Sequence, residues 1–304
     1  MIKCQKFNLY KLLATYHKQT QEELIISLIE LIPKITSEHK PNSDIYKYIA
    51  GVTKNAIEYL YGPGNLEKIN MGQLGLINIP FFSMGAINTT HLFGLDELIL
   101  FSFYLKNKFT YKKVGDLGAN VGVHSIILSN LGFDVTSYEP DAIHFEKIKE
   151  NININCKNNK PHIVNKAISY KSGHVEFLRV KGNTTGSHIK GSKNDPYGEI
   201  ESIKVETDSF KDIMKNLDFM KIDIEGHEAE VLRSTSKEDW LNTDAMVEVG
   251  SESNAKIIFE FFKSIEINLF SQKTGWDLVQ NIQNMPYSYK DGSLFITNKS
   301  YVPW

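Results

Sequence analysis

Four residues near the middle of the chain have the types and the spacing of a ligand-binding turn. In the stretch KKVGDLGANVGVHS an aspartate closes a short apolar run and opens the pattern D-x-G-x-N-x-G, which consists of Asp116, Gly118, Asn120 and Gly122. Glycine lets the backbone approach a ligand closely, because it has no Cβ. The pattern therefore predicts a small-molecule site at a strand-to-helix turn.

The charge of Asp116 indicates which ligand fits this turn. A turn that binds a diphosphate has the pattern G-x-G-x-x-G, and a carboxylate at the strand end would repel the phosphates. S-adenosylmethionine carries an ammonium and a sulfonium and no phosphate, so it suits an acid. Glu139 ends the next apolar run, 21 residues after Gly118 (139 − 118), where an acid can accept hydrogen bonds from ribose hydroxyls. The pair of acids predicts an S-adenosylmethionine site.

Both acids also have simpler interpretations. Asp116 could cap the helix that follows it, and Glu139, which precedes Pro140 and Asp141, could belong only to a helix-start turn. The spacing of the two acids around one glycine turn favours the cofactor site over two unrelated structural roles.

Candidate reactive groups lie in DFMKIDIEGHEAEVL, where a second apolar run ends in acids. Asp223 and Glu225 are two residues apart and point the same way in an extended segment. Apolar surroundings raise the pKa of a carboxylate toward the range of a general base, so Asp223 is our first candidate for the base and His227 the second. Glu228 and Glu230 follow in the first turn of a helix, where acids suit the helix dipole, and are interpreted as structural.

An alternative role for these acids is metal binding. Asp223 and Glu225, together with Glu248 at the end of the run MVEV, offer the hard oxygen ligands that Mg²⁺ prefers. Such an ion would lower the pKa of an acceptor hydroxyl. Of the other histidines, His124 is expected to be structural, whereas His188 could bind substrate or face solvent.

The elements that position these residues alternate in type from residue 112 onward. Strand-like runs (KKVGDL, DVTSYEP, HIVNKAIS, FMKIDIEG and DAMVEVG) alternate with helical segments at 121–131, 142–155, 227–235 and 254–263. This alternation predicts an α/β fold with a mostly parallel sheet and helices on both faces. The last runs, INLFSQ and GSLFITN, predict an antiparallel pair that closes the sheet. Ligands in such sheets bind outside the carboxyl ends of the strands.

The first 90 residues have a different pattern. Residues 1–60 are predicted to be mostly helical, the break YGPGN follows at 61–65, and residues 66–90 predict small strands or an irregular cover. A helix is expected over 91–107. We therefore predict an N-terminal extension at 1–90, which could cap the substrate cleft or form a homodimer interface, and a catalytic domain at 91–304.

The composition is that of an ordinary globular protein. The chain has 304 residues, 41% of them hydrophobic and 23% charged, with a net charge of −2 that does not favour nucleic acid. The two cysteines, Cys4 and Cys156, are too few for a disulfide framework. No apolar stretch approaches the ~20 residues of a membrane span, and the N-terminus lacks the apolar core of a signal peptide, so a cytoplasmic location is expected.

Taken together, several segments of the sequence resemble the FkbM family of S-adenosylmethionine-dependent methyltransferases. They are VGDLGANVGVHSIILSNLGFDVTSYEPD, NKAISYKSGHVEF, NTTGSH, VETDSF and FMKIDIEGHEAEVLRS, with D-I-E-G-H-E the most specific. The resemblance covers roughly residues 90–250, and the N-terminal 90 residues depart from it.

The resemblance implies a seven-stranded, Rossmann-like class I methyltransferase sheet and an O-methyltransferase that acts on a hydroxyl of a sugar, a glycan or a secondary metabolite. It implies that Asp223, Glu225 and His227 line the reaction site. NTTGSH (183–188) would be a polar loop across the site mouth, and Asp208 the family's acid before the fourth strand. The implied cofactor contacts are Asp116, Gly118, Ala119, Asn120, Gly122, Glu139 and Asp223.

Three other functions are considered. A nucleic-acid methyltransferase, for example one acting on RNA ribose, is disfavoured by the lack of net positive charge, and DIEG replaces the Asn/Asp-Pro-Pro-aromatic motif of base amino-group methylation. An NAD(P)-binding oxidoreductase is disfavoured by Asp116. An inactive interaction module is disfavoured because Asp116, Glu139 and Asp223 are all retained.

Overall fold

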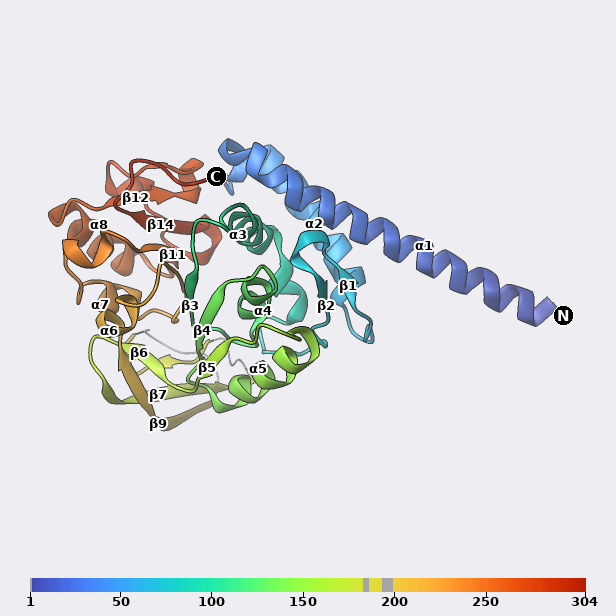
Figure 1. Ribbon diagram of the computed structural model, residues 1–304, viewed down its shortest axis with the longest axis horizontal. Helices are drawn as coiled ribbons and strands as arrows, with labels where there is room; N and C mark the ends of the chain where they lie inside the picture. Colours follow the sequence, from blue (N-terminus) through green and yellow to red (C-terminus); the bar gives the residue numbers. More distant parts are fainter. Residues whose placement is uncertain (1, 183–185, 193–198) are drawn as a thin grey trace.

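The computed structural model describes residues 2–182, 186–192 and 199–304, with side chains from residue 17 onward. Its main sheet has eight strands in the order β13-β12-β14-β11-β10-β3-β4-β5 (Figure 1). The strands are β3 (Lys113–Leu117), β4 (Asp134–Tyr138), β5 (His162–Val164), β10 (Phe219–Ile222), β11 (Asp244–Glu248), β12 (Asn268–Ser271), β13 (Asp277–Leu278) and β14 (Ser293–Thr297).

The strand directions confirm the predicted class of sheet. β5, β4, β3, β10 and β11 are parallel, and β14 is antiparallel to both of its neighbours, β11 and β12. Seven strands thus form the expected sheet with an antiparallel closing strand, and the two-residue β13 adds an edge. The register pairs Asp116 with Lys221 and with Ser137, so the carboxyl ends of β3, β4 and β10 meet.

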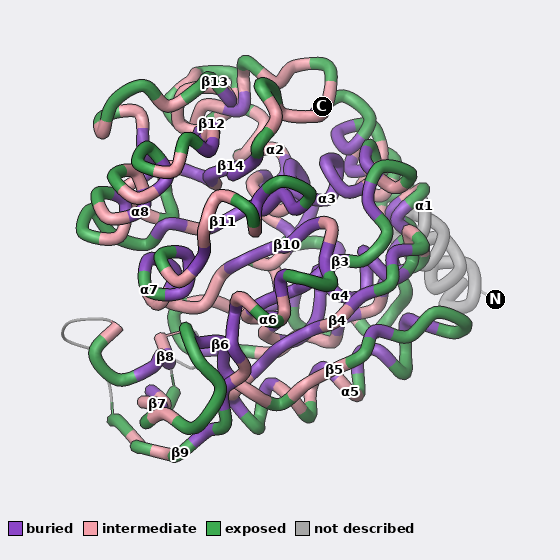
Figure 2. The backbone as a smooth tube through the Cα atoms, turned by 60° about the vertical axis from the view of Figure 1, so that its left-hand side comes forward, coloured by how far each residue is buried: buried purple, intermediate pink, exposed green. Residues whose placement is uncertain are grey.

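Two apolar layers enclose the sheet because its central strands are buried on both faces. Val114, Phe219 and Met246 contribute to one core cluster, while their strand neighbours Met220 and Val247 contribute to the other. This is the two-residue period of a strand, and Figure 2 shows the resulting buried centre. The helices of the domain are α3 (Leu95–Lys106), α4 (Val123–Asn130), α5 (Ala142–Asn155), α6 (Phe210–Met214), α7 (Glu228–Leu232) and α8 (Glu252–Ser264).

The N-terminal segment is helical, as expected, and shares a core with the rest of the chain. It contains α1 (Ile2–Leu31), α2 (Asp44–Tyr61) and the short strands β1 (Ile69–Asn70) and β2 (Leu76–Ile77). Side chains of α1, α2 and α3 lie in one core cluster. The division at residue 90 and the cap or homodimer role stay predictions.

A polar network fastens this segment to the C-terminal part. Asp96 of α3 accepts hydrogen bonds from Tyr46 Oη of α2 (2.7 Å) and from Gln272 Nε2 (2.6 Å). The remaining short elements are 3-10 helices at Ile32–Lys34, Thr36–His39, Gly72–Leu74, Thr89–Phe93, Lys237–Trp240, Gln272–Thr274, Ile282–Asn284 and Tyr289–Asp291.

A second sheet, which the sequence patterns did not indicate, lies between β5 and β10 along the chain. Its order is β6-β9-β7-β8, with β6 (Ala167–Ser169), β7 (Gly173–Lys181), β8 (His188–Ile189) and β9 (Glu199–Ser209). The run HIVNKAIS, predicted as one strand, is divided between the two sheets at Asn165, whose side-chain amide donates to the carbonyls of Glu139 and Pro140. Much of this sheet is exposed (Figure 2). Within NTTGSH, Asn183–Thr185 fall outside the described residues.

Within the described part of the chain, no helix combines the length and the apolar character needed to cross a bilayer.

Candidate functional site

The glycine turn after β3 is held between the ends of two neighbouring strands. The peptide N–H groups of Gly118 and Ala119 both donate to the carbonyl of Tyr138, at 3.0 and 2.9 Å. Gly118 has φ +83°, and a Cβ there would lie 1.7 Å from the carbonyl oxygen of Asp223. The position therefore requires glycine, both for its backbone angle and for the close approach of the β10 end. Gly122, with φ +88°, is the N-cap of α4.

Asp116 lies beneath this turn and is fully buried. Its Oδ2 accepts a hydrogen bond from Ser125 Oγ (2.5 Å), which in turn accepts one from Ser137 Oγ (2.8 Å). Lys221 Nζ is 4.0 Å from Oδ1. Oδ1 has no hydrogen-bond partner among the described residues. The predicted direct contact of Asp116 with the cofactor stays a prediction.

Glu139 is held in place by two peptide groups. Its Oε2 accepts from the N–H of Asn120 (2.9 Å) and its Oε1 from the N–H of Asp141 (2.8 Å). Burial raises the pKa of Glu139 to about 8, although these two bonds favour the ionised form. Asn120 takes φ +52°, a left-handed conformation that asparagine tolerates better than most residues. The N–H groups of these two peptides fix the carboxyl group of Glu139 at the end of β4.

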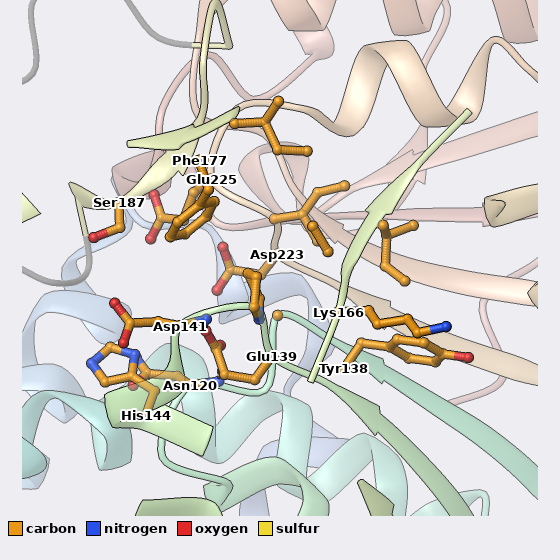
Figure 3. A pocket seen from close by; sticks show the side chains of 16 residues that line it. Asn120, Tyr138, Glu139, Asp141, His144, Lys166, Phe177, Ser187, Asp223 and Glu225 are labelled. Atoms are coloured by element: carbon orange, nitrogen blue, oxygen red, sulfur yellow. Dashed lines mark hydrogen bonds between the residues drawn. The ribbon is translucent and has the colours of Figure 1, made fainter. Parts of the chain in front are cut away.

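A cavity of about 610 Å³ opens at these strand ends (Figure 3). The turn and the end of β4 form one side of it, and the small sheet forms the other. Its lining residues are Gly118, Asn120, Tyr138, Glu139, Pro140, Asp141, His144, Lys166, Ala167, Ile168, Phe177, Ser187, Ile189, Asp223, Ile224 and Glu225.

The lining of this cavity fits S-adenosylmethionine. Glu139 offers carboxylate oxygens to a ribose, and Phe177, Ile168 and Ile189 offer apolar surface to a purine ring. Asn120 Oδ1 is buried and has no hydrogen-bond partner among the described residues, so it can accept one from a ligand. Gly118 itself presents no side chain to the cavity.

The segment after β10 is shaped by a buried acid. Glu228 Oε1 accepts hydrogen bonds from the N–H groups of Ile224 (3.1 Å) and Gly226 (3.0 Å). Its Oε2 accepts one from Asn254 Nδ2 (3.0 Å). Together these bonds fix the loop in which Glu225 takes a left-handed φ of +58° and lines the cavity. The geometry agrees with the structural interpretation of Glu228.

Asp223 has a cation beside it. Lys221 Nζ lies 3.2 Å from Asp223 Oδ2 and donates to the carbonyl of Gly118 at 3.2 Å. Burial lowers the pKa of Lys221, but the charges of Asp223 and Asp116 outweigh burial and hold that pKa above its usual value. The lysine therefore stays charged beside Asp223.

A second cavity, of about 420 Å³, is also lined by Asp223. Glu248, at the end of β11, lines it too, and the charge of Asp223 together with burial raises the pKa of Glu248 well above its usual range. The other lining residues come from α3, β10, β11 and the C-terminal segment: Asp96, Glu97, Leu100, Lys221, Ile222, Met246, Tyr289, Gly292 and Ser293.

The three histidines considered in the sequence analysis, His124, His188 and His227, lie in different environments. His227 lies between the loop and the small sheet, with Nε2 3.3 Å from Ser169 Oγ and Nδ1 3.0 Å from Ser192 Oγ. Burial lowers the pKa of His227, and this effect is larger than the increase in pKa caused by the charge of Glu230. It is not among the described residues that line either cavity.

His124 is buried between Tyr104 Oη and Glu97 Oε2, each 2.9 Å from a ring nitrogen. This environment agrees with the structural role expected for it. His188 is also buried, with Nδ1 2.8 Å from the carbonyl of Gly186. Of its two proposed roles, exposure to solvent is therefore wrong, and substrate binding stays a prediction.

The proposed magnesium site gains no support from the geometry. Within the described residues, no three or more His, Cys, Asp or Glu side chains are grouped so that they could hold a metal ion. The cation next to Asp223 is the Lys221 ammonium.

The sequence analysis missed Lys221, Asp141 and Arg179. Lys221 is a lysine inside an otherwise apolar strand, which is a recognisable signal. Asp141 follows Glu139 and Pro140 directly, but its partner, Arg179, lies 38 residues away in a sheet that was not predicted. Asp208, expected as a family acid, lies in β9 and pairs with Lys166 (2.9 Å).

Several solved structures are similar to this chain at low sequence identity. No curated protein matches the chain. Among solved structures, the precorrin-6Y C5,15-methyltransferase of Geobacter metallireducens is similar, with 11% identity and a TM-score of 0.36, over 64% of this chain and 86% of that one. An O-methyltransferase of Bacillus cereus in complex with SAH has 10% identity and a TM-score of 0.34, over 64% and 78%. A ribosomal protein L11 methylase of Lactobacillus delbrueckii subsp. bulgaricus has 10% identity and a TM-score of 0.34, over 65% and 78%.

The family comparison is more specific. The model of the methyltransferase FkbM domain matches residues 116–280, which is more than half of the 304 residues. The matched range begins at the aspartate of the glycine turn and includes Glu139, Asp223 and Glu248. The chain belongs to the FkbM family of S-adenosylmethionine-dependent methyltransferases.

Proposed function

We propose that this methyltransferase transfers the methyl group to a hydroxyl of a sugar, a glycan or a secondary metabolite. The observation that carries the proposal is that Asp223 lines two cavities. One fits the methyl donor, and the acceptor approaches through the other. A group transfer between two ligands needs such a meeting point.

The chemistry required of the protein is limited. When bound, the cofactor supplies a methyl group on a positively charged sulfur, which is already activated for displacement. The side chains must align the acceptor oxygen and remove its proton. We assign the removal of this proton to Asp223, whose Oδ2 lies 3.2 Å from Lys221 Nζ.

Glu248 supports this assignment by its charge state. Two carboxylates close to one cavity do not both ionise readily, and the one with the raised pKa keeps its proton. The pKa of Glu248 is raised chiefly by the charge of Asp223. A protonated Glu248 can donate a hydrogen bond to an acceptor molecule in this cavity. His227, the second candidate base, is engaged by Ser169 and Ser192 instead.

The charge of the second cavity favours a neutral, hydroxyl-bearing acceptor. Asp96, Glu97, Asp223 and Glu248 line it, with Lys221 as the counter-charge. Hydroxyl groups donate hydrogen bonds to carboxylates, whereas a phosphate in the same place would be repelled. This distribution also disfavours RNA as the acceptor.

A labelling experiment tests the proposal. Purified protein and S-adenosylmethionine with an isotope-labelled methyl group are incubated with a panel of hydroxylated sugars and with a cell extract. We expect a product heavier than its precursor by one CH₂ group, with the labelled carbon on oxygen. Label on nitrogen, or only in the RNA fraction, would contradict the proposal.

A further inference from the structure

The small sheet closes the cofactor cavity from the side opposite the glycine turn. Phe177 of β7, Ser187 and Ile189 at β8, and Ile168 of β6 all line this cavity. In Figure 3, Phe177 and Ser187 lie across the cavity from Asn120 and His144. The position of the sheet therefore decides the width of the space left for the nucleoside.

An ion pair joins this sheet to the opposite side. Arg179 of β7 donates from Nε to Asp141 Oδ2 (2.9 Å) and from its second terminal nitrogen, Nη2, to Oδ1 (3.0 Å). The Asp141 side chain is only 2% exposed and that of Arg179 14%. A two-point contact of this kind, largely removed from water, is stronger and more directional than a surface ion pair. Arg179 also reaches Glu201 of β9, at 3.3 Å.

Asp141 links this ion pair to Glu139, the carboxyl group that faces the cofactor cavity. Its Oδ1 accepts from the N–H of Ile143 (2.8 Å), in the first turn of α5, and its own N–H donates to Glu139 Oε1 (2.8 Å). The orientation of the Asp141 peptide thus depends on a side chain that Arg179 holds. Removing Arg179 leaves a buried carboxylate without its cation, and Asp141 must then move to reach water.

We propose that Arg179 is a positioning residue for the nucleoside half of the cofactor: through Asp141 it fixes Glu139 and fastens the small sheet as the outer wall of the cavity. The inference rests on the cofactor assignment and does not depend on the identity of the acceptor. The ligand addressed is an adenine nucleoside, because the elements that Arg179 joins surround the ribose and purine end of the site.

The test is the affinity of Arg179→Met for two probes, S-adenosylmethionine and 5′-methylthioadenosine, by isothermal titration calorimetry. The second probe has the nucleoside but lacks the amino-acid part. We expect both dissociation constants to rise by the same factor, about tenfold, because one charged hydrogen-bonding contact is lost. Glu201→Gln removes only the outer contact of Arg179 and should change either constant by less than about twofold.

A double-mutant cycle separates positioning from general support. In a Glu139→Gln background, the effect of Arg179→Met should be smaller than in the wild type, since the route through Glu139 is already altered and only the attachment of the small sheet is lost. Any of three results would overturn the inference. The effects of Arg179→Met and Glu139→Gln could be fully additive, the loss of affinity could be confined to S-adenosylmethionine, or the affinity for both probes could be unchanged.

Two precautions keep the test decisive. If Arg179→Met does not fold, as judged by circular dichroism, Arg179→Lys carries the test, because it keeps the charge and loses the two-point geometry. A loss of at least about threefold for both probes is then expected, and wild-type affinity would contradict the inference. These measurements use no acceptor, so failure of the proposed hydroxyl transfer would leave them unaffected.

Discussion

The two cavities that meet at Asp223 are built from different kinds of chain segment. On its inner side, the cofactor cavity is built from residues 118–141, close together in sequence. The second cavity collects Glu97, Lys221, Glu248 and Tyr289 from four distant segments. A local motif is thus enough to build most of the proposed donor side, whereas the proposed acceptor side requires the whole fold.

The charges of the two cavities are also balanced in different ways. Glu139 is held by two peptide N–H groups, which are fixed by the backbone. Around Glu248, the charges of Asp223, Glu225 and Glu97 oppose ionisation, and Lys221 offsets them in part. The first arrangement is suited to holding a ligand, and the second to moving a proton. Four experiments test this division.

Asp223→Asn should produce the largest effect. Turnover should fall by about a hundredfold or more, since a general base contributes 10²–10⁴-fold, while the affinity for S-adenosylmethionine changes by less than about threefold. Turnover is measured as S-adenosylhomocysteine release with the acceptor found by labelling, and affinity by calorimetry. The exposed Glu230→Gln on α7 is the matched control. Full turnover in Asp223→Asn would remove this residue as the base.

Glu139→Ala should weaken cofactor binding more than it slows turnover. The dissociation constant of S-adenosylmethionine should rise at least about tenfold, because a hydrogen-bonding group for the ribose is lost. Turnover at saturating cofactor should be affected less. Glu146→Ala, an exposed acid on α5, is the calorimetric control. Unchanged affinity in Glu139→Ala would place this residue outside the site.

The pH dependence of stability should report the burial of Glu139. Its pKa is about 8 in the folded protein against an ordinary 4.5, so the folded state binds more protons between these values. Stability should therefore fall as pH rises from about 4.5 to about 8. Thermal unfolding of wild type should lose several degrees relative to Glu139→Gln over this window. Parallel curves for the two proteins would contradict the raised pKa.

The smallest effect is expected from metal removal. The described residues contain no acid or histidine cluster suited to a metal, and Lys221 supplies the cation beside Asp223. Turnover should be the same with and without EDTA. A loss that Mg²⁺ restores would revive the metal hypothesis for Asp223, Glu225 and Glu248.

The sequence predictions were accurate where neighbouring residues determine the structure, and they failed where residues far apart in the sequence determine it. Helix 142–155 begins and ends where expected, because Asp141 caps it locally through the N–H of Ile143. The second sheet was missed because β7 has a mixed pattern of burial and its partner β9 lies about twenty residues away. Periodicity gives little information when neither face of a strand is consistently buried.

What the sequence determined by itself is the donor side: the glycine turn, the acids that end β3, β4 and β10, and the order of strands and helices that brings them together. These features follow from backbone angles, strand periodicity and the lack of a Cβ at Gly118, all of which act over a few residues. The tertiary structure alone decided that Lys221 pairs with Asp223, that Glu248 shares their cavity, and that Arg179 holds Asp141. Such contacts depend on the packing of distant segments, and their charges interact strongly because that packing removes water.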